Sequence, residues 1–154
     1  MGNSGTIRAG EVQRMTAGRG ILHSEFNPSP GEECHLLQIW IVPRERGLTP
    51  SYDQKFFAPE SKKGKLLPIA SPDGRDGSMK IEQDASIYAS LLAPGETVAH
   101  ALAPDRHGWV QVARGSVTLN ERLLSEGDGA AISDEQRLAL RGETDAELLL
   151  FDLA

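Results

Sequence analysis

Turn-forming residues interrupt this chain so often that no long helix fits between them. The 154 residues include 16 glycines and 9 prolines, gathered in clusters such as Ala17–Gly20, Asn27–Gly31 and Ser71–Gly74. The runs between these clusters are short and several are rich in β-branched and aromatic residues, which is typical of strands. Strands at this spacing predict an all-β fold, either a sandwich or a barrel.

The clearest predicted strand is Cys34–Val42, CHLLQIWIV, which is bounded by turn residues and too short for a typical helix. A second strand is predicted over Ile21–Phe26, and a single helical turn is predicted near Pro59–Lys63. The other predicted strands are Glu11–Met15, Ser51–Phe57, Lys65–Ile69, Ser86–Leu92, Thr97–Leu102, Trp109–Ala113, Ser116–Leu119, Gly129–Ile132, Arg137–Leu140 and Glu147–Leu153.

The charge balance and the short apolar runs exclude several classes of function. A net charge of −6 argues against binding of nucleic acid, which needs a basic face. The longest apolar run, near Ile39–Val42, is far too short for a membrane span. The first residues do not resemble a secretory signal, and the single cysteine, Cys34, suits a reducing compartment. We therefore expect a cytoplasmic protein without a nucleic-acid or membrane partner.

His23 and Glu25 are the residues most suggestive of chemistry. They lie two apart on a predicted strand, so both side chains are expected on one face. An imidazole and a carboxylate placed in this way can share a metal such as iron, copper, zinc or manganese. By spacing alone the pair also fits the solvated polar side of an ordinary strand. The sequence contains no motif of a standard hydrolase, nucleotide-binding or dinucleotide-binding protein.

Three stretches together resemble the pirin family of cupin proteins. They are AGEVQRMTAGRGILHSEFNPS from Ala9, HLLQIWIVP from His35 and TPSYDQKFF from Thr49. The resemblance implies a bicupin, in which two jelly-roll β-barrels are stacked in one chain. It also implies one mononuclear metal, commonly iron, held in the first barrel by three histidines and one glutamate. Some bacterial relatives oxygenate the flavonol quercetin, whereas the animal relative is nuclear and modulates transcription factors.

By this resemblance, His23 and Glu25 correspond to the third and fourth metal ligands, and Glu25 is also a candidate catalytic base. The family's first two ligands form a His-x-His on an earlier strand, but no histidine precedes His23 here. Residues Met1–Gly5 resemble the turn that follows the absent strands. The resemblance therefore implies an N-terminally truncated bicupin that lacks two of its metal ligands.

The expected domains follow from this truncation. Residues 1–58 would form a partial first barrel, residues 59–65 a linker, and residues 66–154 a complete but degenerate second barrel. The second barrel is expected to be metal-free, because His100 lies near a first-ligand position but Leu102 stands where another histidine would be needed. Core positions are expected for Cys34, Trp40 and Trp109, and a buried or edge structural position is expected for His35. A structural or surface role is expected for His100 and His107.

Two functions remain open from the sequence. The first is a metal-dependent dioxygenase acting on a flavonol-like aromatic such as quercetin, with the missing ligands supplied by a longer chain or a partner. The alternative is a non-catalytic relic that serves as an interaction or regulatory module. Because a partial barrel would expose open sheet edges, we expect a homo-oligomer in either case.

Overall fold

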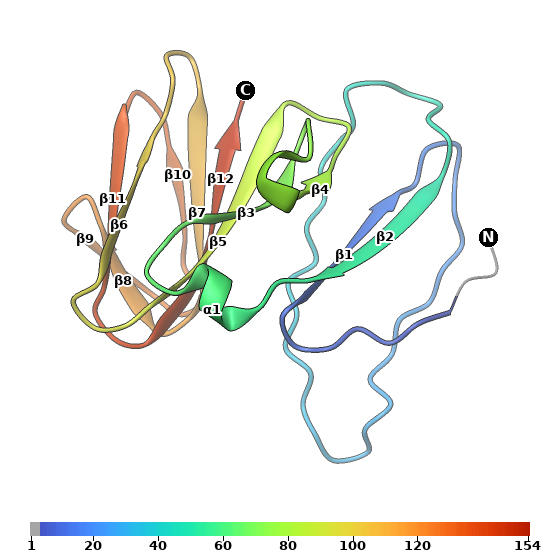
Figure 1. Cartoon of the computed structure of the whole chain (residues 1–154), viewed down its shortest axis with the longest axis horizontal. Coiled ribbons are helices and arrows are strands. Elements are labelled where there is room, and N and C mark those ends of the chain that lie inside the picture. Colours follow the sequence, from blue (N-terminus) through green and yellow to red (C-terminus); the bar gives the residue numbers. More distant parts are fainter. Residues whose placement is uncertain (1–3) are drawn as a thin grey trace.

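The computed structural model describes residues 4–154 and is built almost entirely of β-strands (Figure 1). The turn expected over Met1–Gly5 begins outside these residues. Near the N-terminus, β1 (Glu11–Thr16) pairs antiparallel with β2 (Ser51–Phe56). The only helices among the described residues are α1 (Pro59–Lys62) and a 3-10 turn, η1 (Arg75–Gly77). No helix in residues 4–154 is long and apolar enough to span a membrane.

The C-terminal part of the chain is a sandwich of two sheets. The six-stranded sheet has the order β10-β7-β12-β5-β3-β4, and the four-stranded sheet has the order β6-β11-β8-β9. Neighbouring strands are antiparallel except for the pair β3 and β4. The bounds are β3 (Leu67–Ser71), β4 (Met79–Lys80), β5 (Ala85–Leu92), β6 (Thr97–Ala101), β7 (His107–Arg114), β8 (Ser116–Leu119), β9 (Arg122–Ser125), β10 (Gly129–Ile132), β11 (Arg137–Gly142) and β12 (Ala146–Leu153).

Strand β12 contributes to both cores of the structure. Its side chains alternate, so Leu148 and Leu150 enter the core shared with the four-stranded sheet. Leu149 and Phe151 point to the opposite face, where a second core gathers residues such as Phe57 from the N-terminal part. A strand buried on both faces reads as a continuous apolar run, which explains the sequence ELLLF.

Most of the predicted strands of the sandwich are confirmed, and so is the helical turn at Pro59. Strand β9 was missed. It follows a two-residue turn in which Asn120 and Glu121 have φ angles of 43° and 71°. Such turns join the strands of a hairpin, but their usual signal is Asn-Gly rather than Asn-Glu.

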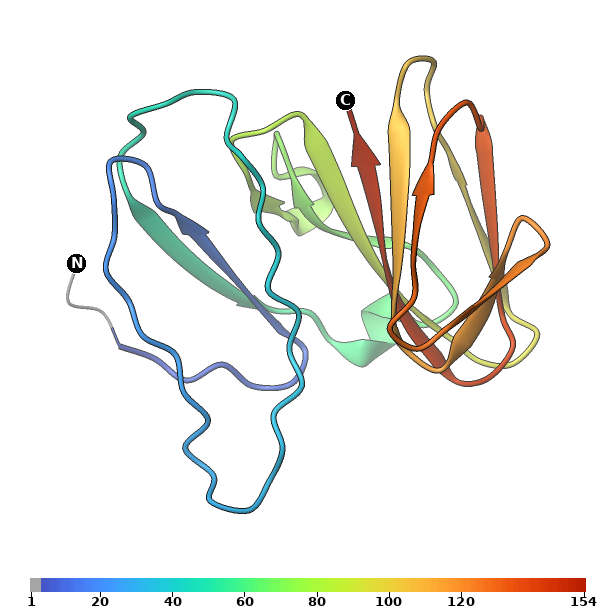
Figure 2. The same ribbon diagram turned by 180° about the vertical axis from the view of Figure 1, so that it is seen from behind.

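The predicted strands over Ile21–Phe26 and Cys34–Val42 are wrong for this structure. Residues 17–50 contain no strand and run as an extended chain, visible as the long blue-to-cyan excursion in Figures 1 and 2. The physical reason is that a strand needs a hydrogen-bonded neighbour, and none of the described residues provides one. The sequence pattern identifies residues suited to a sheet, but it does not supply the adjacent strand.

The expected burial of several side chains in this region is also wrong. Trp40 is 85% exposed, and Cys34 and His35 are exposed as well. Trp109, on β7, is 38% exposed because its face of the sheet looks toward the extended chain. Cys34 and the two tryptophans were expected in the core, and His35 at a buried or edge position, but the described residues do not enclose them.

Because β12 is buried on both faces, truncating one of its core leucines to alanine should lower the free energy of unfolding far more than truncating a surface leucine. Leu148→Ala removes a fully buried side chain and should lower the free energy of unfolding by about 2–5 kcal/mol, because it leaves a cavity. Leu123→Ala, at a leucine that is 64% exposed, should change it by less than about 0.5 kcal/mol. Urea denaturation followed by circular dichroism measures both, and equal effects would contradict the assignment of the core.

Candidate functional site

A tight turn brings the chain from β1 to the candidate metal ligands. Gly18 has a φ of +52°, and a Cβ at this position would lie 2.0 Å from the carbonyl oxygen of Leu48. The backbone N–H of Arg19 donates to the same oxygen at 3.1 Å. Only glycine allows both the left-handed φ and this close approach. The turn therefore fixes the start of the extended segment against the residues that lead into β2.

His23 and Glu25 lie on this extended segment, and both are exposed. Among residues 4–154, no three or more His, Cys, Asp and Glu side chains come together in a group that could hold a metal. The imidazole and carboxylate are chemically suited to a metal with mixed nitrogen and oxygen ligands. Two protein donors are nevertheless too few, since such centres use at least three. The described residues therefore do not form a complete metal centre.

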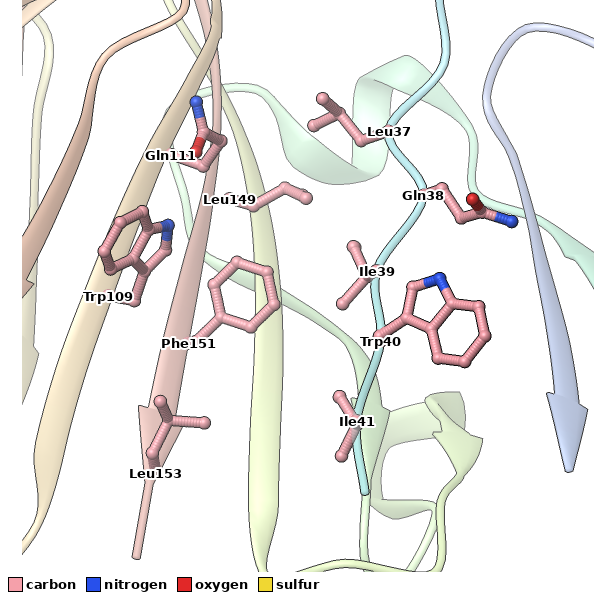
Figure 3. A pocket seen from close by; sticks show the side chains of 10 residues that line it. All are labelled: Leu37, Gln38, Ile39, Trp40, Ile41, Trp109, Gln111, Leu149, Phe151 and Leu153. Atoms are coloured by element: carbon pink, nitrogen blue, oxygen red, sulfur yellow. The ribbon is translucent and has the colours of Figure 1, made fainter. Parts of the chain in front are cut away.

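Downstream, the segment from Leu37 to Ile41 keeps the two-residue alternation of a strand (Figure 3). Leu37, Ile39 and Ile41 point toward the six-stranded sheet, whereas Gln38 and Trp40 point away from it. A cavity of about 360 Å³ lies between this segment and the sheet. Its walls on the sheet side are Trp109, Gln111, Leu149, Phe151 and Leu153.

The end of this segment is fixed to the sandwich by polar contacts. The backbone N–H of Arg44 donates to the carbonyl oxygen of Glu82 at 2.8 Å. The Gln83 side-chain amide donates to the carbonyl oxygen of Val42 at 2.7 Å. Ile41 also packs on the edge of the second core. The segment is thus held in place at its end, although its own backbone is not part of a sheet.

A cluster of polar side chains around Asp152 lies at one end of the sandwich. His100, on β6, makes a hydrogen bond of 2.8 Å from Nε2 to Oδ2 of the buried Asp152 on β12. Arg106 donates from Nε to the other oxygen of Asp152 and from Nη1 to Asp84 at 3.1 Å. The Asp152 carboxylate raises the pKa of Arg106, chiefly through this hydrogen bond. The Tyr88 ring lies 4.9 Å from the His100 ring, centroid to centroid.

This cluster gives His100 a structural role. The His100 imidazole is paired with the Asp152 carboxylate, which also binds the Arg106 guanidinium. These contacts join β6, β12 and the loops before β5 and β7. Sequence reasoning did not find Asp84, Arg106 or Asp152, which lie far apart along the chain. One signal was available, because Asp152 is the only charged residue within the apolar end of β12. A charge in such a run is tolerated only where it is paired.

Comparison with known proteins decides the family. Residues 68–153 match the sequence profile of the quercetinase C-terminal cupin domain, and residues 1–41 match the pirin profile. The chain belongs to the pirin family. His23 and Glu25 lie within the stretch that matches the pirin profile, and the sandwich lies within the match to the C-terminal cupin domain.

Curated relatives and solved structures agree with this assignment. A quercetin 2,3-dioxygenase of Escherichia coli strain K12 is 48% identical over 99% of this chain, and a pirin-like protein of Caulobacter vibrioides is 40% identical over the whole of this chain. The crystal structure of YhhW from Escherichia coli superposes on the whole chain with a TM-score of 0.94 at 46% identity. A structure of bacterial pirin YhhW from Escherichia coli in complex with nickel(II) covers 99% of the chain with a TM-score of 0.92 at 47% identity.

The match covers only part of each relative. The chain spans 65% of the Escherichia coli dioxygenase, 66% of the Caulobacter protein, and 64% and 65% of the chains in the two crystal structures. These likenesses establish the cupin-type sheets of the pirin family. Within residues 67–153, however, the strands belong to two separate sheets, and a continuously hydrogen-bonded barrel is not observed.

The Asp152 cluster predicts a specific loss of stability. Asp152→Ala leaves the guanidinium of Arg106 and the imidazole of His100 without their buried partner, so it should lower the free energy of unfolding by about 1–3 kcal/mol. Glu82→Ala breaks an exposed pair with Lys80 and should cost less than about 1 kcal/mol. Thermal denaturation compares the two variants. A neutral Asp152→Ala would show that the cluster does not stabilise the sandwich.

Proposed function

We propose that this chain supplies part of a metal-dependent dioxygenase centre that acts on a flavonol such as quercetin. The observation that carries the proposal is the His-x-Glu pair, His23 and Glu25, within the stretch that matches the pirin profile. It is supported by the 48% identity to the Escherichia coli quercetin 2,3-dioxygenase and by the nickel(II) complex of a related pirin. Iron is the proposed physiological metal, and Glu25 the proposed ligand that could also act as a base.

The pirin resemblance implies three histidines and one glutamate at this centre, so two further protein ligands are proposed. The described residues offer only His23 and Glu25 at the proposed position, so the other donors must come from a polypeptide segment that completes the site. We propose that metal binding by this chain alone is weak and that tight binding requires that segment. The same proposal divides the chain into a partial first barrel over residues 1–58, a linker over 59–65 and a second barrel over 66–154.

The role of His23 and Glu25 predicts how metal binding responds to mutation. His23→Ala and Glu25→Gln should each weaken nickel(II) or iron(II) binding by at least about tenfold. Removal of a residue that only hydrogen-bonds to a metal ligand usually lowers metal affinity by about 10- to 100-fold, and removal of the ligand itself should lower it at least as much. His107→Ala should leave binding unchanged, since His107 is exposed on β7 and bonded to Ser133. Isothermal titration calorimetry measures the affinities. Measurable binding of equal affinity by all three variants would exclude this site.

A second candidate function, self-association, is favoured by the exposed apolar segment. Phe26, Trp40 and Val42, all on the extended chain between β1 and β2, are 82%, 85% and 81% exposed, and exposed apolar surface can serve as an interaction site. Unpaired extended backbone beside such side chains pairs readily with another copy. We propose that the isolated chain self-associates through this segment, whether or not it binds metal.

Self-association predicts a mass that depends on protein concentration. Size-exclusion chromatography with light scattering should show species larger than a monomer, increasing as the protein is concentrated. Trp40→Asp should shift the population toward the monomer, because it places a charge in the segment. Leu123→Asp, on the distant strand β9, should leave the mass unchanged. A monomer at high concentration would contradict self-association.

A further inference from the structure

The sheet side of the cavity described above is built around a tryptophan that is held in place. The indole ring of Trp109, on β7, lies across Gly129 on the neighbouring strand β10, and a Cβ at Gly129 would be only 2.3 Å from Cζ2 of the ring. Gly129 does not have a positive φ, so the backbone alone does not require glycine there. A glycine within a strand often marks such a close approach. The ring is therefore seated on the sheet and presents its remaining surface to the cavity of about 360 Å³.

A polar group with a fixed orientation lies beside this ring. Gln111 follows Trp109 on the same face of β7 and lines the same cavity. Its side-chain amide donates to the carbonyl oxygens of Gly127 and Asp128, at 3.1 and 3.0 Å. Both amide hydrogens are used in this way, so Oε1 is the atom left for a ligand. In Figure 3 this oxygen lies on the Trp109 side of the amide.

The other walls of the cavity are apolar, and none of the described residues that line it is charged. Leu149 and Phe151 extend the sheet side, and Leu37, Ile39 and Ile41 form the opposite wall (Figure 3). An ionised ligand would lose its hydration here without gaining a partner. Apolar walls with a few placed polar groups are typical of small-molecule sites, which have volumes of about 300–1,000 Å³. The cavity therefore suits a small, uncharged ligand.

We propose that this cavity is a binding site for a neutral, planar phenol of the naphthol class. The fused rings would pack against Trp109 and Phe151, in the offset or edge-to-face arrangements that aromatic rings prefer. The hydroxyl would donate to Oε1 of Gln111, the one acceptor that the cavity holds in a fixed orientation. The site goes beyond the proposed function, because neither His23 nor Glu25 lines the cavity and no metal takes part in binding.

A small phenol fits the cavity better than a polypeptide does. A peptide strand carries an N–H and a C=O at almost every residue, and burying them against apolar walls without partners is costly. The cavity offers one oriented amide oxygen, which matches a ligand with one hydroxyl. An aliphatic alcohol of the same size would make the hydrogen bond but would lack the favourable contacts between aromatic rings.

The test is calorimetric titration of the metal-free chain, in the presence of EDTA, with 2-naphthol and two related compounds. Naphthalene lacks the hydroxyl, and 2-naphthoate carries a carboxylate instead. We expect 2-naphthol to bind with 1:1 stoichiometry. Naphthalene should bind about 3- to 10-fold more weakly, because one hydrogen bond is lost. 2-Naphthoate should bind at least about tenfold more weakly, because its charge would be buried without a partner.

Three variants assign the contacts. Trp109→Leu should weaken 2-naphthol binding about 3- to 10-fold, because the contact between rings is lost. Gln111→Leu should weaken 2-naphthol binding by a similar factor but change naphthalene binding by less than about twofold, since only the hydroxyl uses the amide. This difference separates a lost hydrogen bond from a general distortion of the sheet. Phe56→Leu, at an exposed aromatic residue on β2, is the matched control and should leave both affinities unchanged.

Nuclear magnetic resonance locates the ligand. The sequence contains two tryptophans, so Trp40→Phe leaves a single indole N–H signal, that of Trp109. We expect 2-naphthol to shift this signal, with the affinity that calorimetry gives.

Three results would overturn the proposal. The first is the absence of 2-naphthol binding up to its solubility limit, and the second is binding that leaves the Trp109 signal unmoved or that is as tight for 2-naphthoate. The third is a Trp109 signal that shifts when the protein is concentrated alone and no longer responds to 2-naphthol, because the occupant would then be a second copy. With EDTA present, each of these results leaves the proposed metal centre untouched.

Discussion

The pairing of strand backbones determines which parts of this chain are regular and which are not. β12 lies inside the six-stranded sheet, with β5 on one side and β7 on the other, so its peptide groups find partners along most of its length. Its side chains enter two cores at once. The sandwich therefore has both its hydrogen bonds and its apolar contacts satisfied by the same strand. Among residues 4–154 no comparable strand lies beside Cys34–Val42, and that segment stays extended without joining a sheet.

The presence or absence of a pairing strand explains why the strands of the sandwich were largely predictable from the sequence and the structure of residues 17–50 was not. In the sandwich, turn residues bound most of the strands, and each strand has a hydrogen-bonded partner among the described residues, so the local pattern locates most of them; β9, which follows an Asn-Glu turn, is an exception. Cys34–Val42 has a stronger strand pattern than several strands that do form. The pattern describes the side chains that a sheet would bury, whereas formation of the strand depends on a neighbour that residues 4–154 do not contain.

The candidate site was likewise predictable only in part from the sequence. His23 and Glu25 could be identified from their spacing and from the pirin resemblance, but neither source shows what surrounds them. In the structure they are exposed on the extended segment, and residues 4–154 bring no group of three or more donors together around them. The Asp152 cluster shows the converse. Its members were not apparent from sequence, since Asp84, Arg106 and Asp152 meet only after β5, β7 and β12 have packed together.

The partial site and the unpaired segment have a common physical origin. A metal centre of this kind needs donors held rigidly on neighbouring strands, because a ligand on a mobile chain loses much of its binding free energy to ordering. The Gly18 turn and the Arg44 contact fix the two ends of the segment that carries His23 and Glu25, but its middle has no sheet to hold it. A strand paired with Cys34–Val42 would order the same segment that presents the two donors. Completion of the sheet and completion of the metal site are therefore expected to be coupled, with each favouring the other.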